Sequence, residues 1–155
     1  MRKIIISTLV FLAGSQLAYA KPKNLTLISQ LTSTQTLDLG KTGQDMGDIV
    51  VNMGDLLNPK TGEKIGSYVN RHILVNVDQP GGTDTRDISI QYTLPGGTIS
   101  MTQIQTYSSA THLPITHGDR AIIGGTRKYS GVKGSQTFTS VNGYPGRFLI
   151  KLNFK

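Results

Sequence analysis

Apolar and polar side chains alternate with a period of two along most of the chain. Residues 87–94 show the alternation most clearly, with apolar side chains at every second position: Ile88, Ile90, Tyr92 and Leu94. Residues 147–154 follow the same pattern, interrupted only at Leu149. Such alternation is typical of half-buried β-strands, whereas an amphipathic helix repeats its apolar positions about every 3.6 residues. The pattern therefore predicts an all-β protein.

About eight strands are expected on this pattern. Besides the two segments above, the candidates are residues 25–31, 48–57, 65–77, 98–107, 121–124 and 135–141. Turns rich in proline and glycine separate several of them, including those at residues 58–62 and 94–97. Short reversals of this kind join antiparallel neighbours. The spacing fits a sandwich or a barrel, and closure into a barrel would remove the exposed strand edges.

The first twenty residues have the composition of an export signal. Arg2 and Lys3 precede an apolar run, and Ala18-Tyr19-Ala20 gives the small-x-small pattern that signal peptidase reads. The run is shorter than the roughly 20 residues that a membrane-spanning helix needs. We therefore expect a cleaved signal peptide at residues 1–20, a single β-barrel domain at residues 21–155 and no stable membrane span. The chain has no cysteine, and export without disulfides favours a bacterial periplasmic or secreted protein.

The charged and histidine side chains predict neither a nucleic-acid partner nor a metal site. The chain carries 16 lysines and arginines against 9 acidic residues, but the cations are scattered rather than gathered in a basic stripe with interleaved aromatics. His112, His117 and Asp119 lie close together in one segment, yet no further fixed ligand completes a defined geometry. We expect no metal and no organic cofactor.

Residues 121–135, AIIGGTRKYSGVKGS, combine four glycines with three cations and so suggest a phosphate-binding loop. A Walker loop requires Gly-Lys followed by Ser or Thr and then a helix. Here Lys133 is followed by Gly134, and the alternating residues 135–141 predict a strand. The glycines therefore do not indicate a nucleotide site.

The same segment resembles the G-G-T-G-x-[FY]-x-x-A-R-G signature of the dirigent and allene oxide cyclase barrels. The matching positions are Gly124, Gly125, Thr126, Tyr129 and Gly134. Further landmarks follow in the family's order at residues 47–57, 62–66 and 94–99, so the resemblance covers about residues 47–138. It implies an eight-stranded antiparallel β-barrel with an apolar cavity, usually assembled as a trimer. In that fold the glycines would allow positive φ and close strand packing.

Several positions depart from the family pattern. Where many phenol-coupling dirigents carry an acid and an arginine, this chain has Lys128 and Lys133, and Arg127 replaces the third glycine of G-G-T-G. The plant cyclases carry a glutamate on the first strand, but residues 25–31 contain no acid and Glu63 lies in a turn. Neither family reaction therefore transfers directly.

Two charged residues lie on otherwise apolar strand faces by parity. Asp55 continues a face of the second expected strand, and Arg71 interrupts a face of the third, which holds Ile65, Val69, Ile73, Val75 and Val77. A charge on such a face is either solvated near a rim or buried and paired. Asp55 is the candidate catalytic acid, with a solvated position beside the turn as the alternative. Arg71 is a candidate lumenal anchor for a carboxylate or phenolate, unless a bulge turns it outward.

Four tyrosines complete the candidate ligand site. Tyr68, Tyr92, Tyr107 and Tyr129 could present hydroxyl groups to a cavity, although aromatic residues in a barrel are often plain packing. The expected function is an exported barrel that binds a small, largely apolar ligand in its lumen. Whether it is an enzyme stays open; the reaction would be a cofactor-free cyclisation or isomerisation. The alternative is a non-catalytic secreted carrier, or a protein-interaction module that uses the outer barrel surface.

Overall fold

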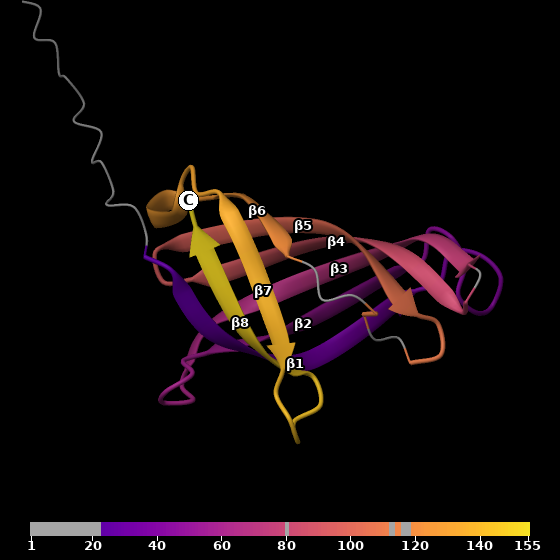
Figure 1. Cartoon of the computed structure of the whole chain (residues 1–155), viewed down its shortest axis with the longest axis horizontal. Coiled ribbons are helices and arrows are strands. Elements are labelled where there is room, and N and C mark those ends of the chain that lie inside the picture. The colour runs from indigo at the N-terminus through magenta and orange to yellow at the C-terminus, as the bar shows by residue number, and fades with distance from the viewer. Residues whose placement is uncertain (1–22, 80, 112–113, 116–118) are drawn as a thin grey trace, which may run out of the picture.

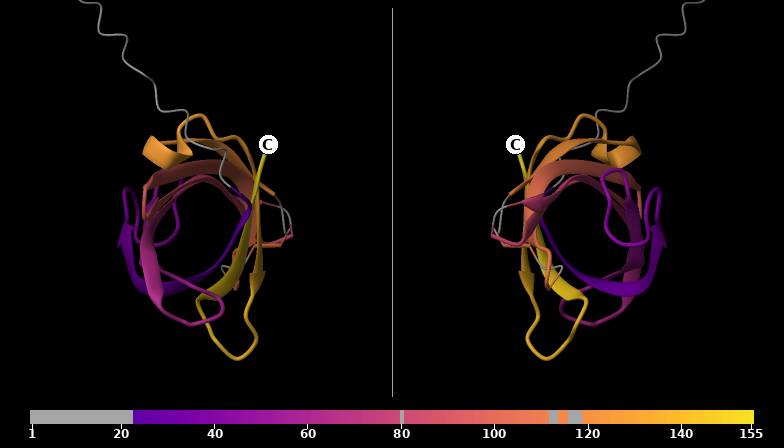
Figure 2. Two further views of the ribbon diagram at one scale, coloured as in Figure 1. Left: turned by 90° about the vertical axis from the view of Figure 1, so that its left-hand side faces the viewer. Right: turned by 90° about the vertical axis from the view of Figure 1, so that its right-hand side faces the viewer.

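Eight antiparallel strands form a closed barrel in which each strand pairs with its neighbour along the chain and the last returns to the first (Figure 1). The computed structural model describes residues 23–79, 81–111, 114–115 and 119–155. Its elements are β1 (Leu25–Leu37), β2 (Ile49–Leu57), β3 (Lys64–Gln79), β4 (Thr83–Leu94), β5 (Gly97–Ser108), β6 (Arg120–Gly125), the 3-10 helix η1 (Arg127–Tyr129), β7 (Gly134–Ser140) and β8 (Arg147–Phe154). Seen along the barrel axis, the strands make a continuous ring (Figure 2). The predicted eight-stranded antiparallel barrel is confirmed.

Two of the expectations, the signal peptide and the histidine segment, concern residues that the structure does not describe. The signal peptide at residues 1–20, with its cleavage site, lies outside the described residues, as do His112 and His117. Within the described part of the chain, no helix combines the length and the apolar character that a bilayer crossing requires.

Strand β1 extends six residues beyond the expected end, to Leu37. Its second half is polar and lacks the alternation that marked the other strands. A bulge between Leu31 and Ser33 shifts its register against β2, after which pairing continues to Leu37 opposite Ile49. Backbone hydrogen bonding to β2, rather than an apolar face, therefore carries this half of the strand.

The two faces of β3 are the reverse of those expected from parity. Tyr68, His72 and Leu74 are buried inside the barrel, whereas Val69 is 45% exposed and Arg71 is exposed on the outer face. Cross-strand pairing continues this outer face onto β2, where Met53 lies opposite Val69 and Ile49 lies opposite Ile73. The apolar parity of β2 and β3 thus marks the exterior.

Aliphatic side chains fill the end of the lumen nearest η1. They include Leu27, Leu56, Leu94, Ile99, Val132 and Leu152, all buried. Helix η1 is fastened over this end, because the Lys128 amide donates to the Gly96 carbonyl and the Thr126 amide donates to the Thr98 carbonyl, each over 3.0 Å. This dry plug leaves the rest of the lumen to a different set of side chains.

Two of the four glycines in residues 121–135, Gly125 and Gly134, allow close backbone packing. A Cβ at Gly125 would lie 2.5 Å from both the Thr98 and Tyr129 carbonyl oxygens, while the space beside Gly124 is open. Gly134 has φ of +148°, and a Cβ there would overlap the Asn153 carbonyl oxygen. The segment is therefore a strand, turn and strand joined by close backbone contact, as the resemblance implied.

The two adjacent glycines give a matched test of this packing. Gly125→Ala should lower the free energy of unfolding by about 1–3 kcal/mol, because the added methyl group overlaps two backbone oxygens that cannot move independently. Gly124→Ala should change it by no more than about 1 kcal/mol, because alanine restricts the unfolded chain and meets nothing in the fold. Urea denaturation of both variants measures the difference. Equal destabilisation would contradict the packing role of Gly125.

Candidate functional site

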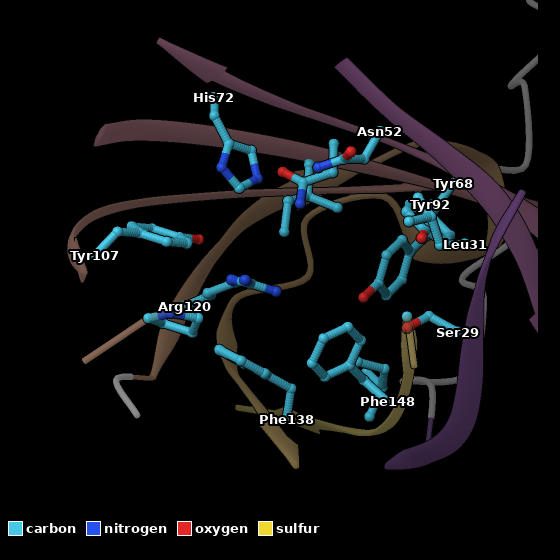
Figure 3. A pocket seen from close by; sticks show the side chains of 15 residues that line it. Ser29, Leu31, Asn52, Tyr68, His72, Tyr92, Tyr107, Arg120, Phe138 and Phe148 are labelled. Carbon is cyan, nitrogen blue, oxygen red and sulfur yellow. The ribbon is translucent and has the colours of Figure 1, made fainter. Parts of the chain in front are cut away.

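The lumen beyond the aliphatic plug holds a cavity of about 260 Å³ (Figure 3). All eight strands contribute to its wall, from Ser29 on β1 to Ile150 on β8. The volume is close to the lower end of the range for small-molecule sites, about 300–1,000 Å³. The barrel closure therefore creates a cavity in the lumen, partly open to solvent, to which every strand presents a side chain.

Aromatic rings make up much of the wall. Tyr68 and Tyr92 meet edge to face with ring centroids 6.3 Å apart, and Phe138 and Phe148 do the same at 5.9 Å. Figure 3 shows these rings around the cavity, with Tyr107 at its far side. Flat rings locked by such pairs offer a rigid apolar surface that suits a flat ligand.

Arg120, the first residue of β6, reaches into this cavity (Figure 3). The residue is only 7% exposed. Its guanidinium lies over the Phe138 ring at 4.1 Å from the centroid and donates a hydrogen bond to the Tyr107 hydroxyl. Burial lowers the pKa of Arg120, partly offset by the surrounding tyrosines, but an arginine keeps its charge in proteins. A full positive charge therefore stands in an aromatic cavity.

His72 lies beside this charge on β3. Its ring packs against Tyr107 with centroids 5.6 Å apart, and the residue is 5% exposed. Burial, followed by the charges of Arg86 and Arg120, lowers the pKa of His72 to about 3. The imidazole is therefore neutral at physiological pH. Neither ring nitrogen has a hydrogen-bond partner in the described part of the chain.

The tyrosine hydroxyls of the cavity are weak acids. Burial raises the pKa of Tyr68 to about 12 and also raises the pKa values of Tyr92 and Tyr107. The Tyr92 hydroxyl accepts a hydrogen bond from the Gln136 side-chain amide at 3.0 Å. These groups are suited to donating hydrogen bonds to a ligand oxygen, not to removing protons at neutral pH.

A second arginine near the cavity is neutralised by an acid. Arg86 donates to Asp84 from Nε at 3.1 Å and from Nη2 at 2.6 Å, and both residues are almost fully buried. Arg86 also lies over the Tyr107 ring, and the hydroxyl of the same tyrosine accepts a hydrogen bond from Arg120. Tyr107 thus joins a neutral ion pair to the unneutralised Arg120.

The structure separates the candidate residues into two groups. Tyr68, Tyr92 and Tyr107 line the cavity, as expected. Tyr129 does not: it lies in η1, buried in the plug with its ring 6.5 Å from that of Phe154.

The two charged candidates lie outside the lumen. Asp55 is on the outer face of β2 and forms an ion pair of 2.7 Å with Lys64, while Arg71 on β3 is exposed. The expected lumenal position of Arg71 is therefore wrong, and Asp55 is solvated on the exterior, the alternative to a cavity acid. Both positions have the same cause. Val51 of β2 pairs with Arg71 on the outer face of the barrel, and the apolar residues of this face made it look like the interior.

Sequence reasoning missed Arg120, His72 and Asn70, which line the cavity. Arg120 lies two residues before the buried Ile122 and therefore on the same face of β6. The expected strand began at residue 121 and so did not include it. His72 and Asn70 share parity with Tyr68 on a face that reads as polar. A polar and aromatic face of one strand is the pattern that would have indicated them.

Comparisons with known proteins place the fold. No protein-family model and no curated protein matches this chain. Among solved structures, a pyocyanin demethylase is 24% identical with a TM-score of 0.66, covering 85% of this chain and 99% of that chain. A pterocarpan synthase dirigent protein is 13% identical with a TM-score of 0.56, covering 86% and 90%. A Diels–Alderase from Streptomyces koyangensis is 13% identical with a TM-score of 0.58, covering 84% and 68%. The chain thus has the barrel fold of the dirigent and cyclase type.

The lowered pKa of His72 predicts a specific pH dependence of stability. Because the unfolded histidine titrates near 6.5 and the folded one near 3, the unfolded state binds more protons between these values, and stability falls as the pH falls. From pH 7.5 to 4.5, the free energy of unfolding should drop by about 2–3 kcal/mol more in the native chain than in His72→Gln. Urea denaturation at the two pH values measures this difference. Equal losses would mean that His72 titrates normally in the fold.

Proposed function

We propose that this chain binds a small, flat, largely apolar ligand in the barrel lumen. The observation that carries the proposal is the lumenal cavity, which is walled by aromatic rings from four strands and bounded at one end by the aliphatic plug. The fold supports it, since the structural neighbours are named for small-molecule chemistry: pyocyanin demethylation, Diels–Alder cyclisation and pterocarpan synthesis.

Unsatisfied polar atoms around the cavity support the same function. Asn70 Oδ1 and both ring nitrogens of His72 are buried without a hydrogen-bond partner among the described residues, and both residues line the cavity. An unsatisfied buried group costs about 1–3 kcal/mol, and native proteins keep few of them. A ligand with oxygen or nitrogen atoms on its rim would satisfy these groups while its rings contact the aromatic wall.

A second candidate function is cofactor-free cyclisation or isomerisation of such a ligand. The supporting observation is the set of hydrogen-bond donors fixed in a buried cavity, namely Arg120 and the hydroxyls of Tyr68 and Tyr107. Preorganised donors stabilise negative charge that develops on a ligand oxygen during a reaction. Catalysis here would consist of positioning and polarising the ligand. A carrier would use the same contacts without a chemical step.

The homotrimer implied by the family resemblance stays a prediction. Its best support is a set of apolar side chains on the outer wall. Register aligns Ile49, Ile73 and Ile104 across β2–β5, with Asp87 between the last two, and the exposed Val69 lies nearby on β3. Exposed apolar patches of this kind mark protein–protein contacts. The same surface is available to the interaction module that we consider as the alternative function.

We also propose that the protein is exported to the periplasm or the medium. The supporting feature is the charged, apolar and small-x-small order of residues 1–20. Expressed in a bacterium, the mature chain should begin at Lys21. Intact-mass measurement of protein from the periplasmic or culture fraction tests this. A chain that still begins at Met1 would exclude cleavage.

Lumenal binding can be tested with the neutral two-ring probe 2-acetylnaphthalene. Ser29, 5% exposed, points into the cavity, so Ser29→Leu should fill part of it and weaken probe binding at least about tenfold. Ser33→Leu is the matched control, because Ser33 lies on the same strand beyond the bulge, opposite the outward-facing Met53. Calorimetric or NMR titration measures the affinities. Equal binding by both variants would place the probe outside the lumen.

Mass spectrometry of small molecules released from gently purified protein would identify the natural ligand. A ligand present in the native chain and absent from Ser29→Leu would support the lumenal site. Retention of the same molecule by both variants would favour the outer surface.

A further inference from the structure

Arg120 carries a buried charge without a counter-ion. The described residues form two ion pairs, Arg86 with Asp84 and Lys64 with Asp55, and neither includes Arg120. No acidic residue of the described chain lines the cavity. Isolating a cation from water is expensive unless an anion or several hydrogen bonds replace the lost hydration.

The groups that touch Arg120 replace only part of that hydration. The Tyr107 hydroxyl accepts one hydrogen bond, and the Phe138 ring faces the guanidinium at 4.1 Å. The Nε–H, by contrast, has no acceptor in the described part of the chain. The Arg120 side chain therefore presents an unused donor and an unpaired charge to the cavity.

Asp84 cannot serve as the missing partner. Its Oδ2 atom accepts two hydrogen bonds from Arg86, and its Oδ1 atom lies 3.4 Å from the Ser109 hydroxyl. Reorienting it toward Arg120 would leave Arg86 buried and unpaired. The two arginines thus have different roles: one is neutralised within the protein, and the other is open to a ligand.

From this contrast we infer that the lumen takes an aromatic carboxylate, whose charged group pairs with Arg120 while its rings lie among Phe138, Phe148 and the tyrosines. The inference rests on the proposed lumenal binding and specifies the class of ligand. A carboxylate suits the site because the planar guanidinium offers parallel N–H donors that match its two oxygens. The Phe138 ring under the guanidinium holds that donor plane in place.

Nearby groups extend the recognition. His72, neutral and without a partner in the described residues, can donate one ring N–H toward a carboxylate oxygen. The Asn70 side chain adds a carbonyl oxygen that can accept from a hydroxyl or amine on the ligand rim. An aromatic carboxylate with a hydroxyl or amine substituent could therefore pair with Arg120 and also donate a hydrogen bond to the Asn70 carbonyl oxygen.

The experiment compares two probes of nearly equal shape, 2-naphthoate and 2-acetylnaphthalene, by titration at pH 7. The native chain should bind 2-naphthoate at least about tenfold more tightly, because only the anion compensates the charge of Arg120. Arg120→Gln should reduce this preference to about twofold or less, and Arg120→Lys, which keeps the charge but not the planar fork, should retain part of it. Arg71→Gln removes a charge from the outer face and should leave the preference unchanged.

A stability measurement without ligand provides a second test. Arg120→Gln removes an uncompensated buried charge, so its melting temperature should equal or exceed that of the native chain. Adding 2-naphthoate should raise the melting temperature of the native chain more than that of Arg120→Gln, because the variant binds the anion more weakly.

The outcomes separate the two levels of the proposal. If the native chain binds both probes equally, or if Arg120→Gln keeps the preference for 2-naphthoate, the carboxylate inference is overturned while lumenal binding stands. If the native chain binds neither probe, lumenal binding of aromatic ligands fails, and the inference fails with it. Should Arg120→Gln not fold, the empty lumen needs the charge for stability, which also contradicts the inference.

Discussion

The pairing of β1 with β8 is the constraint on which the rest of the structure depends. Register runs from Leu25 opposite Leu152 to Gln30 opposite Arg147, where the arginine Nε donates to the Gln30 side chain over 2.6 Å. Once eight strands close, the interior is just wide enough for side chains or one small ligand. Every second residue is then directed into that space, whether it is apolar or not. Closure thus directs Arg120, His72 and Asn70 into the lumen, although none of these residue types is typical of a core.

The buried charges in and around the lumen differ in whether a counter-ion neutralises them. At one end, aliphatic residues and η1 exclude water, and at the other the Asp84–Arg86 pair neutralises itself. Between them, Arg120 is the unpaired charge of the described wall. Burial, followed by the charges of Arg86 and Arg120, keeps His72 neutral. Because opposite charges attract strongly at low dielectric, an anion entering this middle section would gain more than it could at the barrel surface. The placement of one ion pair therefore sets the electrostatic character of the whole cavity.

Alternation in the sequence was enough to predict the architecture but not the site. It identified β4 correctly, because Ile88 and Tyr92 face a packed core and the opposite residues are polar. On β3 it identified which residues share a face and assigned the wrong face to the interior, because the outer Val69 and Ile73 are more apolar than the inner Asn70 and His72. Periodicity carries no information on which side of a strand a barrel encloses. The enclosed side depends on contacts between strands far apart in the sequence. For this reason Arg71 was assigned to the lumen, where the structure places Arg120 instead.

The signature segment bears on the chemistry in an unexpected way. Its departures from the family pattern at Arg127 and Lys128 fall on η1, where Lys128 lies near the face of Tyr129 rather than in the cavity wall. They consequently leave the lumen unchanged, and its character comes from Arg120 on the strand before. That lumen holds hydrogen-bond donors and a neutral imidazole whose pKa is about 3, but its described wall holds no carboxylate. These side chains are therefore better suited to polarising a ligand oxygen with fixed donors than to removing a proton at neutral pH.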